Sequence, residues 1–251
     1  MILNAAAYHF VDVADPAELA ARLRERADTA GLHGTVLVAP EGLNLFLAGP
    51  EPELRGFLDA LRADARFADM LAKLSWSRAQ PFGRLKVKVK PEIISYRRDD
   101  ASPLEGRAPA VDPPTLARWI AQGMDDAGKR LVLLDTRNRE EVGYGTFANA
   151  LTLPIDNFTE LPAALEPHRD ALADATVVSF CTGGIRCEKA ALQLRADGMD
   201  NVLQLDGGIL GYFERVGGFG YEGRCFVFDG RVALDASLAP LIDGGAEADV
   251  R

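Results

Sequence analysis

The sequence contains few cysteines and histidines and no long apolar run. Three cysteines in 251 residues cannot form a dense disulfide scaffold, so we expect a protein of the reducing cytoplasm. No apolar stretch approaches the ~20 residues of a membrane-spanning helix, and the first residues lack the basic segment of a secretory signal. The histidines are scattered, the cysteines lack C-x-x-C spacing, and no G-x-G-x-x-G segment follows a predicted strand. We therefore predict no metal site, no flavin site and no membrane contact.

Acidic side chains outnumber basic ones, but the excess is unevenly distributed. The net charge is −9, which argues against a protein that coats nucleic acids generally. Residues 71–98 nevertheless contain eight basic residues and one acidic residue, and such a patch can dock a polyanion. The alternative is a solvated edge strand whose lysines prevent aggregation. The candidates for phosphate contacts to a nucleic acid are Arg84, Lys86, Lys88, Lys90, Arg97 and Arg98, and the candidates for base stacking, or else for the core, are Trp76, Phe82 and Tyr96.

Residues 1–98 follow the pattern strand, helix, strand, strand, helix, strand. Pro16 occupies a favoured position in the first turn of a helix, and the Pro-Glu-Gly trio at 40–42 turns the chain between two strands. Apolar residues alternate with lysines in Leu85–Val89, so we predict the last strand there. This order predicts an α+β domain of the ferredoxin-like (βαββαβ) type. The predicted elements are strands at 7–13, 35–39, 43–48 and 85–89 and helices at 15–30 and 51–61.

Strands alternate with helices beyond a polar, proline-containing linker at 99–114. This alternation predicts a parallel α/β domain, covered on both faces of its sheet, over residues 115–220. A partly irregular extension at 221–251 follows it. The predicted elements are strands at 130–135, 148–154, 176–180 and 202–205 and helices at 115–122 and 188–197.

The most informative segment is a short loop at the end of an apolar strand. The strand ends at Cys181, two glycines and an arginine follow, and a helix begins near Cys187. Loop N–H groups and the helix N-terminus at the carboxyl end of a parallel strand stabilise a thiolate and hold an anion beside it. A buried, inert cysteine is the alternative, but this order of residues favours a reactive thiol. We predict Cys181 as the catalytic residue and an anion-cradling loop made of Thr182, Gly183, Gly184, Ile185 and Arg186.

The other two cysteines are weaker candidates for chemistry. Cys187 lies on the predicted first helical turn, where it either joins the core or acts as a resolving thiol if it approaches Cys181. Cys225 lies outside the loop, and we expect it to be structural.

Three segments within residues 115–220 resemble a rhodanese domain. The segments are Asp135-Thr136-Arg137 with Glu140 or Glu141, the run Gly145–Leu151, and Leu205-Asp206-Gly207-Gly208-Ile209. In the run Gly145–Leu151, Thr146 stands where rhodaneses usually carry His, and Asn149 stands in place of a Gly.

A more specific resemblance covers nearly the whole chain. The run CTGGIRCEKA at 181–190 is similar to the signature of the bacterial rhodanese-containing tRNA uridine-34 hydroxylases, as are segments 41–44, 86–90 and 225–229. In that family a ferredoxin-like domain precedes the rhodanese domain. The resemblance implies conversion of the tRNA wobble uridine to 5-hydroxyuridine, with tRNA as partner, molecular oxygen as co-substrate and an unidentified reductant. It also implies that Cys181 is the active cysteine, which is often described as persulfide-forming.

Three other functions remain open from the residues alone. A sulfurtransferase would form a persulfide on Cys181, which the loop N–H groups favour, but the basic segment would then have no role. A thiol phosphatase carries Cys-x5-Arg, whereas four residues separate Cys181 from Arg186, and the tighter loop suits a persulfide better than a phosphoryl group. A regulatory RNA- or protein-binding module would leave Cys181 unreactive.

Overall fold

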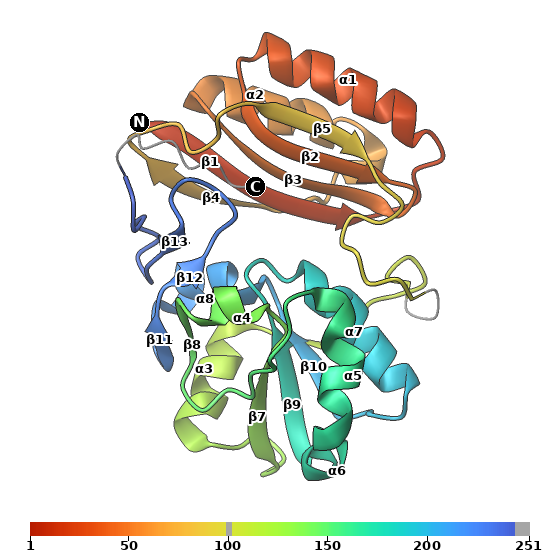
Figure 1. Cartoon of the computed structure of the whole chain (residues 1–251), viewed down its shortest axis with the longest axis vertical. Helices are drawn as coiled ribbons and strands as arrows, with labels where there is room; N and C mark the ends of the chain where they lie inside the picture. The colour runs from red at the N-terminus through yellow and green to blue at the C-terminus, as the bar shows by residue number, and fades with distance from the viewer. Residues whose placement is uncertain (99–101, 244–251) are drawn as a thin grey trace. The chain divides into compact units, whose positions relative to one another are not determined.

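The computed structural model describes residues 1–98 and 102–243, and the chain divides into two compact units (Figure 1). Unit 1 consists of residues 1–95 together with 228–232 and the described residues from 239 onward. Unit 2 consists of residues 96–227 and 233–238. The segment expected to form a C-terminal extension is thus shared between the units, and its last residues, 244–251, lie outside the described part of the chain.

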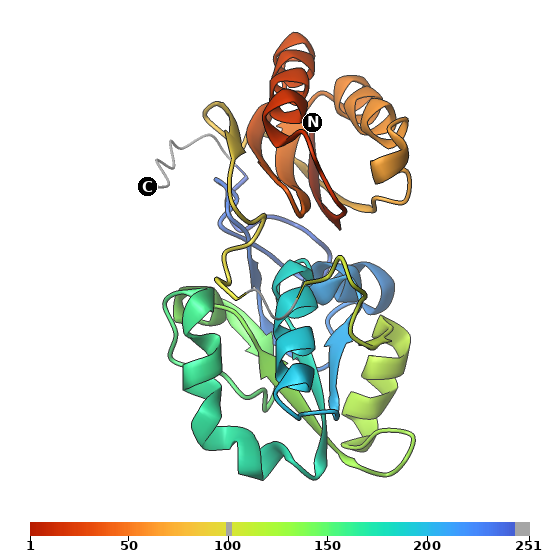
Figure 2. The same cartoon turned by 90° about the vertical axis from the view of Figure 1, so that its right-hand side faces the viewer.

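Unit 1 has a five-stranded sheet with both of its α-helices on one face, as Figure 2 shows. Alternate residues of the central strands face the helices, and leucines with a few aromatic residues fill the space between the two layers. Its elements are β1 (Ile2–Phe10), α1 (Pro16–Thr29), β2 (His33–Ala39), β3 (Gly42–Gly49), α2 (Glu51–Arg62), β4 (Ala72–Ser77) and β5 (Leu85–Val89).

The strand order β4-β1-β3-β2-β5 confirms the ferredoxin-like class and corrects one assignment. The fourth strand of the βαββαβ pattern is β4, which pairs antiparallel with β1. The strand predicted for that place, β5, is an additional edge strand that runs parallel to β2. The sequence of β4, AKLSWS, has a weak apolar alternation at one edge of the sheet, whereas LKVKV gives the stronger strand signal.

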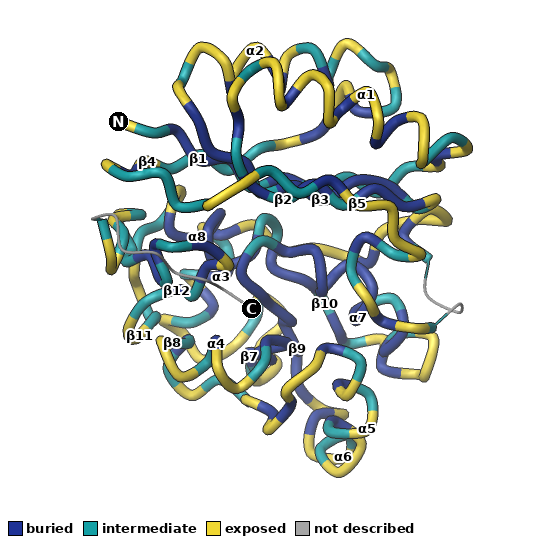
Figure 3. Tube along the Cα trace, turned by 45° about the horizontal axis from the view of Figure 1, so that its top comes forward, coloured by how far each residue is buried: buried dark blue, intermediate teal, exposed yellow. Residues whose placement is uncertain are grey.

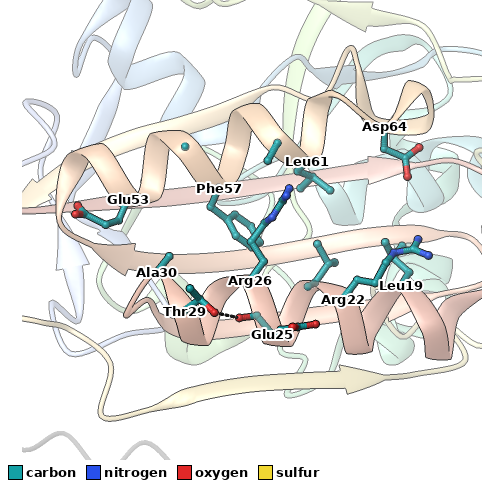
Figure 4. Close-up of a pocket in the computed structure, with 13 residues that line it drawn as sticks. Leu19, Arg22, Glu25, Arg26, Thr29, Ala30, Glu53, Phe57, Leu61 and Asp64 are labelled. Atoms are coloured by element: carbon teal, nitrogen blue, oxygen red, sulfur yellow. Dashed lines mark hydrogen bonds between the residues drawn. The ribbon is translucent and has the colours of Figure 1, made fainter.

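A groove of about 690 Å³ lies between α1 and α2 (Figure 4). Phe57 and Leu61 lie among its lining residues, and its charged residues have both signs. One of them, Arg22, is already paired with Glu18 and Asp15. None of the site residues predicted from the sequence lines this groove, so the candidate site lies elsewhere.

Unit 2 is built on a four-stranded sheet whose pairings are all parallel, and helices lie on both sides of it (Figure 2). This arrangement confirms the parallel α/β class predicted for the second half of the chain. Its sheet strands are β6 (Ala110–Val111), β7 (Arg130–Asp135), β9 (Ala175–Phe180) and β10 (Val202–Leu205), its short strands are β8 (Gly145–Phe147), β11 (Tyr221–Gly223), β12 (Cys225–Phe226) and β13 (Ala233–Leu234), and its helices are α3 (Pro113–Gln122), α4 (Arg139–Val142), α5 (Leu161–Leu165), α6 (Arg169–Leu172), α7 (Ile185–Ala196) and α8 (Gly208–Val216).

The strand predicted at 148–154 is wrong. That segment contributes a single bridge, between Leu134 and Leu151, because Asn149 adopts a positive φ of 60° that interrupts extended backbone. The nearby strand is β8, which pairs with β11 instead of joining the parallel sheet. In the sheet itself β9 lies between β10 and β7 and is buried along its whole length, as Figure 3 shows.

Candidate active site

Cys181 follows directly on the carboxyl end of β9, and α7 begins four residues later. A central strand of a parallel sheet directs its carboxyl end toward the edge where α/β folds place their sites. The four-residue loop between β9 and α7 therefore holds the thiol at the N-terminus of α7, as the sequence predicts. Gly184 has a φ of +102°, a conformation that side chains other than glycine's rarely adopt.

The loop surrounds the Cys181 sulfur with hydrogen-bond donors. The Gly184 N–H lies 3.1 Å from Sγ, and the Arg186 N–H and the Cys187 thiol also donate to it. Burial of the fully enclosed side chain favours the neutral thiol. The hydrogen bond from Cys187, the positive charge of Arg186 and the two backbone N–H groups outweigh this burial and lower the pKa of Cys181 to about 5. Cys181 is therefore a thiolate at neutral pH.

Cys187 lies on the first turn of α7, in contact with Cys181. Burial and the neighbouring thiolate raise the pKa of Cys187 well above its usual value, and its sulfur also lies 3.7 Å from the Thr136 hydroxyl oxygen. Neither cysteine forms a disulfide. The pair thus has one proton between two sulfurs at neutral pH, an arrangement that suits a nucleophile and its resolving thiol.

The Arg186 side chain forms a buried ion pair with Glu141, which lies on α4. Two hydrogen bonds of 2.5 and 2.6 Å join the guanidinium to the carboxylate, and both side chains are buried. Thr182 also donates to Glu141, at 3.3 Å. Arg186 therefore supplies charge to the site while its guanidinium is held by Glu141, and backbone N–H groups make the contacts to sulfur. The sequence pointed to Glu141 only through the rhodanese resemblance and indicated no partner for it.

A second buried cluster fixes the segment where rhodaneses usually carry His. Asp135 and Arg137 pair through contacts of 2.9 and 2.6 Å and are both fully buried. Thr146 donates to Asp135 at 2.7 Å, and Arg137 donates to the Gly145 carbonyl at 2.7 Å. The threonine hydroxyl thus donates a hydrogen bond to the buried carboxylate, and this contact gives Thr146 a structural role.

The segment Leu205–Ile209 holds the cysteine loop from the other side. The N–H groups of Ile209 and Leu210 donate to the carbonyls of Cys181 and Thr182 at 2.9 and 3.0 Å. Gly208 has a φ of +62°, and a Cβ there would lie 2.5 Å from the Cys181 carbonyl oxygen. Only glycine allows this approach, which explains the second glycine of the motif.

We expect Gly208→Ala to lower the free energy of unfolding by about 1–3 kcal/mol more than Gly123→Ala does. Gly123 has a similar φ of +70°, but a Cβ at that position would have no atom within 4 Å, so it reports backbone strain without the clash. Urea denaturation of the two variants measures the difference. Equal destabilisation would contradict the close contact between Gly208 and the loop.

Ultraviolet thiolate absorbance is expected to reveal one group that titrates near pH 5 and is missing in Cys181→Ser. Because the folded-state pKa lies below the unfolded one, the unfolded chain binds more protons between these two values. Stability relative to Cys181→Ser therefore rises with pH, by at most about 1.4 kcal/mol per pH unit, and is lost as pH falls toward 5. A wild-type titration curve that matches Cys181→Ser would contradict the assignment.

Cys225 is fully buried, and burial raises its pKa to about 12. It therefore stays protonated and unreactive at neutral pH, as expected for a structural cysteine. Tyr96, a candidate for base stacking, is also part of a core. Its hydroxyl donates to Gln193 at 2.6 Å, and its ring stacks on Phe158 at 4.5 Å. The aromatic side chain most exposed among the three candidates is Trp76, at 39%.

The structure separates the basic residues predicted to contact RNA into two groups. Lys86 and Lys88 share one face of the edge strand β5 in unit 1, with Arg84 just before the strand and Lys90 just after it. The other two candidates, Arg97 and Arg98, belong to unit 2.

Two kinds of feature are missing from the part of the chain that the structure describes. Across residues 1–98 and 102–243, no group of three or more His, Cys, Asp and Glu side chains is placed to hold a metal ion. No helix in the same residues has both the length and the apolar character needed to cross a membrane.

Two stretches of the chain match the models of known domain families. Residues 2–93 match the UPF0176 acylphosphatase like domain, and residues 116–215 match the rhodanese-like domain. Among solved structures, the rhodanese-like domain of an Anabaena protein has a TM-score of 0.38 at 19% identity and covers 57% of this chain and 92% of its own. Acylphosphatase from Bacillus subtilis has a TM-score of 0.28 at 19% identity, and the match covers 35% of this chain and 99% of the acylphosphatase chain.

Full-length relatives are much more similar. The tRNA uridine(34) hydroxylase of Xanthomonas campestris pv. campestris (strain B100) is 70% identical over 99% of this chain and 98% of its own length. The tRNA uridine(34) hydroxylase of Xylella fastidiosa (strain 9a5c) is 62% identical over 97% of this chain and 95% of its own length. Identity of this degree over both units shows that the chain belongs to the tRNA uridine(34) hydroxylase family.

Proposed function

We propose that this protein converts uridine 34 of tRNA to 5-hydroxyuridine in an oxygen-dependent reaction, with Cys181 as the catalytic residue. Identity of 62–70% to tRNA uridine(34) hydroxylases along nearly the whole chain carries the proposal. The Cys181 thiolate, held by loop N–H groups, supplies the chemical group around which the reaction is organised. Free thiols and a tRNA substrate fit a cytoplasmic enzyme.

The thiolate can activate the uracil ring for oxidation. Attack of the Cys181 sulfur on C6 forms a carbon–sulfur bond and moves the electron pair of the C5=C6 bond to C5 and the C4 oxygen. The electron-rich C5 then accepts an oxygen atom from an oxidant at the peroxide level. Loss of the C5 proton and departure of the thiolate restore the double bond and free the enzyme.

The oxidation balances with one molecule of O₂ and one two-electron reductant. One oxygen atom enters the product, and the other leaves as water with two protons. Cys187 protects the site if Cys181 is oxidised to a sulfenic acid, because its thiol displaces water to give a disulfide that a cellular thiol can reduce. The contact between the two sulfurs supports this role for Cys187.

Basic residues at the edge of unit 1 are proposed to hold the tRNA backbone. Arg84, Lys86, Lys88 and Lys90 lie on or next to β5, in a protein whose net charge of −9 repels RNA elsewhere. Arg97 and Arg98 contribute further positive charge near the start of unit 2. Phosphate contacts of this kind position the RNA without specifying its sequence.

A sulfurtransferase is the second candidate function. The N–H donors around Cys181 suit the anionic outer sulfur of a persulfide as well as they suit a thiolate. Rapid turnover of thiosulfate by the full chain, without any effect on tRNA nucleosides, would favour this function.

Expression of this chain in bacteria that lack their own tRNA uridine-34 hydroxylation tests the proposal. Nucleoside mass spectrometry of purified tRNA is expected to show 5-hydroxyuridine-type nucleosides only when the chain is present. Their absence, with folded protein detected in the cells, would contradict the proposed function.

A further inference from the structure

One row of side chains crosses all five strands of unit 1 on the face away from its helices. The register pairs Lys73 of β4 with Ala6, Ala6 with Phe46 of β3, Phe46 with Thr35, and Thr35 with Lys86 of β5. Paired residues point to the same face of a sheet, and their apolar neighbours along each strand belong to the core under the helices or pack against it. The row therefore has a lysine at each end and one aromatic ring in the middle.

Phe46 differs from the other residues of β3 in its exposure to solvent. It is the one residue of β3 that is not buried. Its neighbours in the row, Ala6 and Thr35, are small and also partly exposed. A flat apolar ring flanked by short side chains leaves room for another flat group to stack on it.

Within β3, the residues of the same face on either side of Phe46, Asn44 and Ala48, are buried. Ser75 belongs to the row of Asn4 and Ala48, and its hydroxyl accepts a hydrogen bond of 2.6 Å from Arg231. On the other side, the carbonyl of buried Ile93 accepts a hydrogen bond of 3.1 Å from Asn44. Phe46 is therefore the one partly exposed residue of β3, and it lies between two buried positions of the same face.

Charge decides which class of ligand suits this row. Strands lie ~4.8 Å apart, so each lysine starts about 10 Å from Phe46 along the row. Cations on both sides of a partly exposed aromatic ring match a strand whose bases stack while its phosphates lie outside. The net charge of −9 disfavours polyanions elsewhere on the protein, which makes the local match selective.

We propose that this row, with Phe46 at its centre, binds the unpaired bases that flank uridine 34 in the tRNA anticodon loop. Phe46 stacks on one base, and Lys73 and Lys86 contact the phosphates on either side. This inference rests on the proposed function for its RNA substrate, and it adds the selection of unpaired over paired RNA to the phosphate contacts of β5.

Binding of two RNA probes by the full-length protein tests this platform. The first probe is a stem-loop with the sequence of a tRNA anticodon arm, and the second is a blunt duplex of the same stem. Phe46→Leu is expected to weaken stem-loop binding by about 5- to 100-fold, because one stacked base is lost, and to leave duplex binding unchanged. Lys86→Ala is expected to weaken the binding of both probes. It should also make the slope of log K against log salt concentration less steep by about 0.7–0.9, the value for one phosphate contact.

Further variants separate stacking from folding. Phe46→Tyr keeps the ring and is expected to bind as wild type does, whereas Thr35→Glu places a negative charge beside an intact Phe46 and is expected to weaken stem-loop binding. Phe219→Leu, which removes a ring that is 51% exposed in unit 2, is the matched control and should change neither probe.

Wild-type stem-loop affinity in Phe46→Leu, or in Thr35→Glu where Phe46→Leu fails to fold, would overturn the platform. Equal weakening of stem-loop and duplex by Phe46→Leu would also overturn it. A wild-type protein that makes no 5-hydroxyuridine would contradict the proposed function alone. The binding measurements test the platform independently, because they do not depend on hydroxylation.

Discussion

Cys181→Ser is expected to reduce 5-hydroxyuridine formation to the background of cells without the protein, a loss of about 10³-fold or more. The serine hydroxyl keeps a pKa far above neutral pH, so it cannot replace a thiolate whose pKa is about 5. Nucleoside mass spectrometry of tRNA from cells that express each variant measures the loss. The loop geometry should persist, because the Gly184 and Arg186 N–H groups can donate to a hydroxyl oxygen as well.

Cys225→Ala is the matched control for this substitution. Its thiol is equally buried and stays protonated, with a pKa of about 12, so its removal should leave hydroxylation near the wild-type level. A Cys181→Ser protein that hydroxylates tRNA at the wild-type rate would contradict the catalytic assignment. It would leave the cysteine loop as a structural feature of a site that works by other groups.

Removal of the Glu141 carboxylate is expected to cause the largest loss of stability among single substitutions at the site. Glu141→Ala should lower the free energy of unfolding by about 3–5 kcal/mol, because Arg186 is left buried without its counter-ion. Burial opposes ionisation of Glu141, but the charge and hydrogen bonds of Arg186 outweigh it and hold the pKa of the carboxyl below its usual value. Urea denaturation at neutral pH measures the change.

Two further variants define what this measurement means. Asp156→Asn removes the partner of Arg139 in an exposed ion pair at the start of the same helix, and it should not change the urea midpoint measurably. Replacing Glu141 and Arg186 together with leucines should restore much of the stability lost in Glu141→Ala, because neither member of this ion pair is then left buried without the other. A wild-type midpoint for Glu141→Ala would show that the ion pair does not support the loop.

The cysteine loop could be predicted from the sequence because all its determinants are local. Within seven residues a strand end, two glycines and a helix start identify where the thiol lies and what its backbone does. The partners that act across the fold gave no such signal. Glu141 meets Arg186 from 45 residues away, and Gly208 meets Cys181 through a loop contact that only the folded chain reveals.

The errors in the predicted fold have the same origin. The strand β4 was missed because a sheet edge needs only a weak apolar pattern, and pairing with β1 supplies the rest. The predicted strand at 148–154 has the apolar composition of a strand, but the positive φ of Asn149 diverts the backbone. Phe46 resembles an ordinary strand residue in the sequence, because the residues beside it are set by the register of β3 with β1 and β2.

Hydroxylation under heavy-isotope oxygen gas tests the central claim most directly. Cells that lack tRNA uridine-34 hydroxylation of their own would express this chain in an atmosphere of ¹⁸O₂, and the tRNA nucleosides would be analysed by mass spectrometry. The account predicts that 5-hydroxyuridine appears at position 34 and carries the heavy isotope in its new hydroxyl group. Unmodified uridine at that position, or a hydroxyl oxygen derived from water, would contradict it.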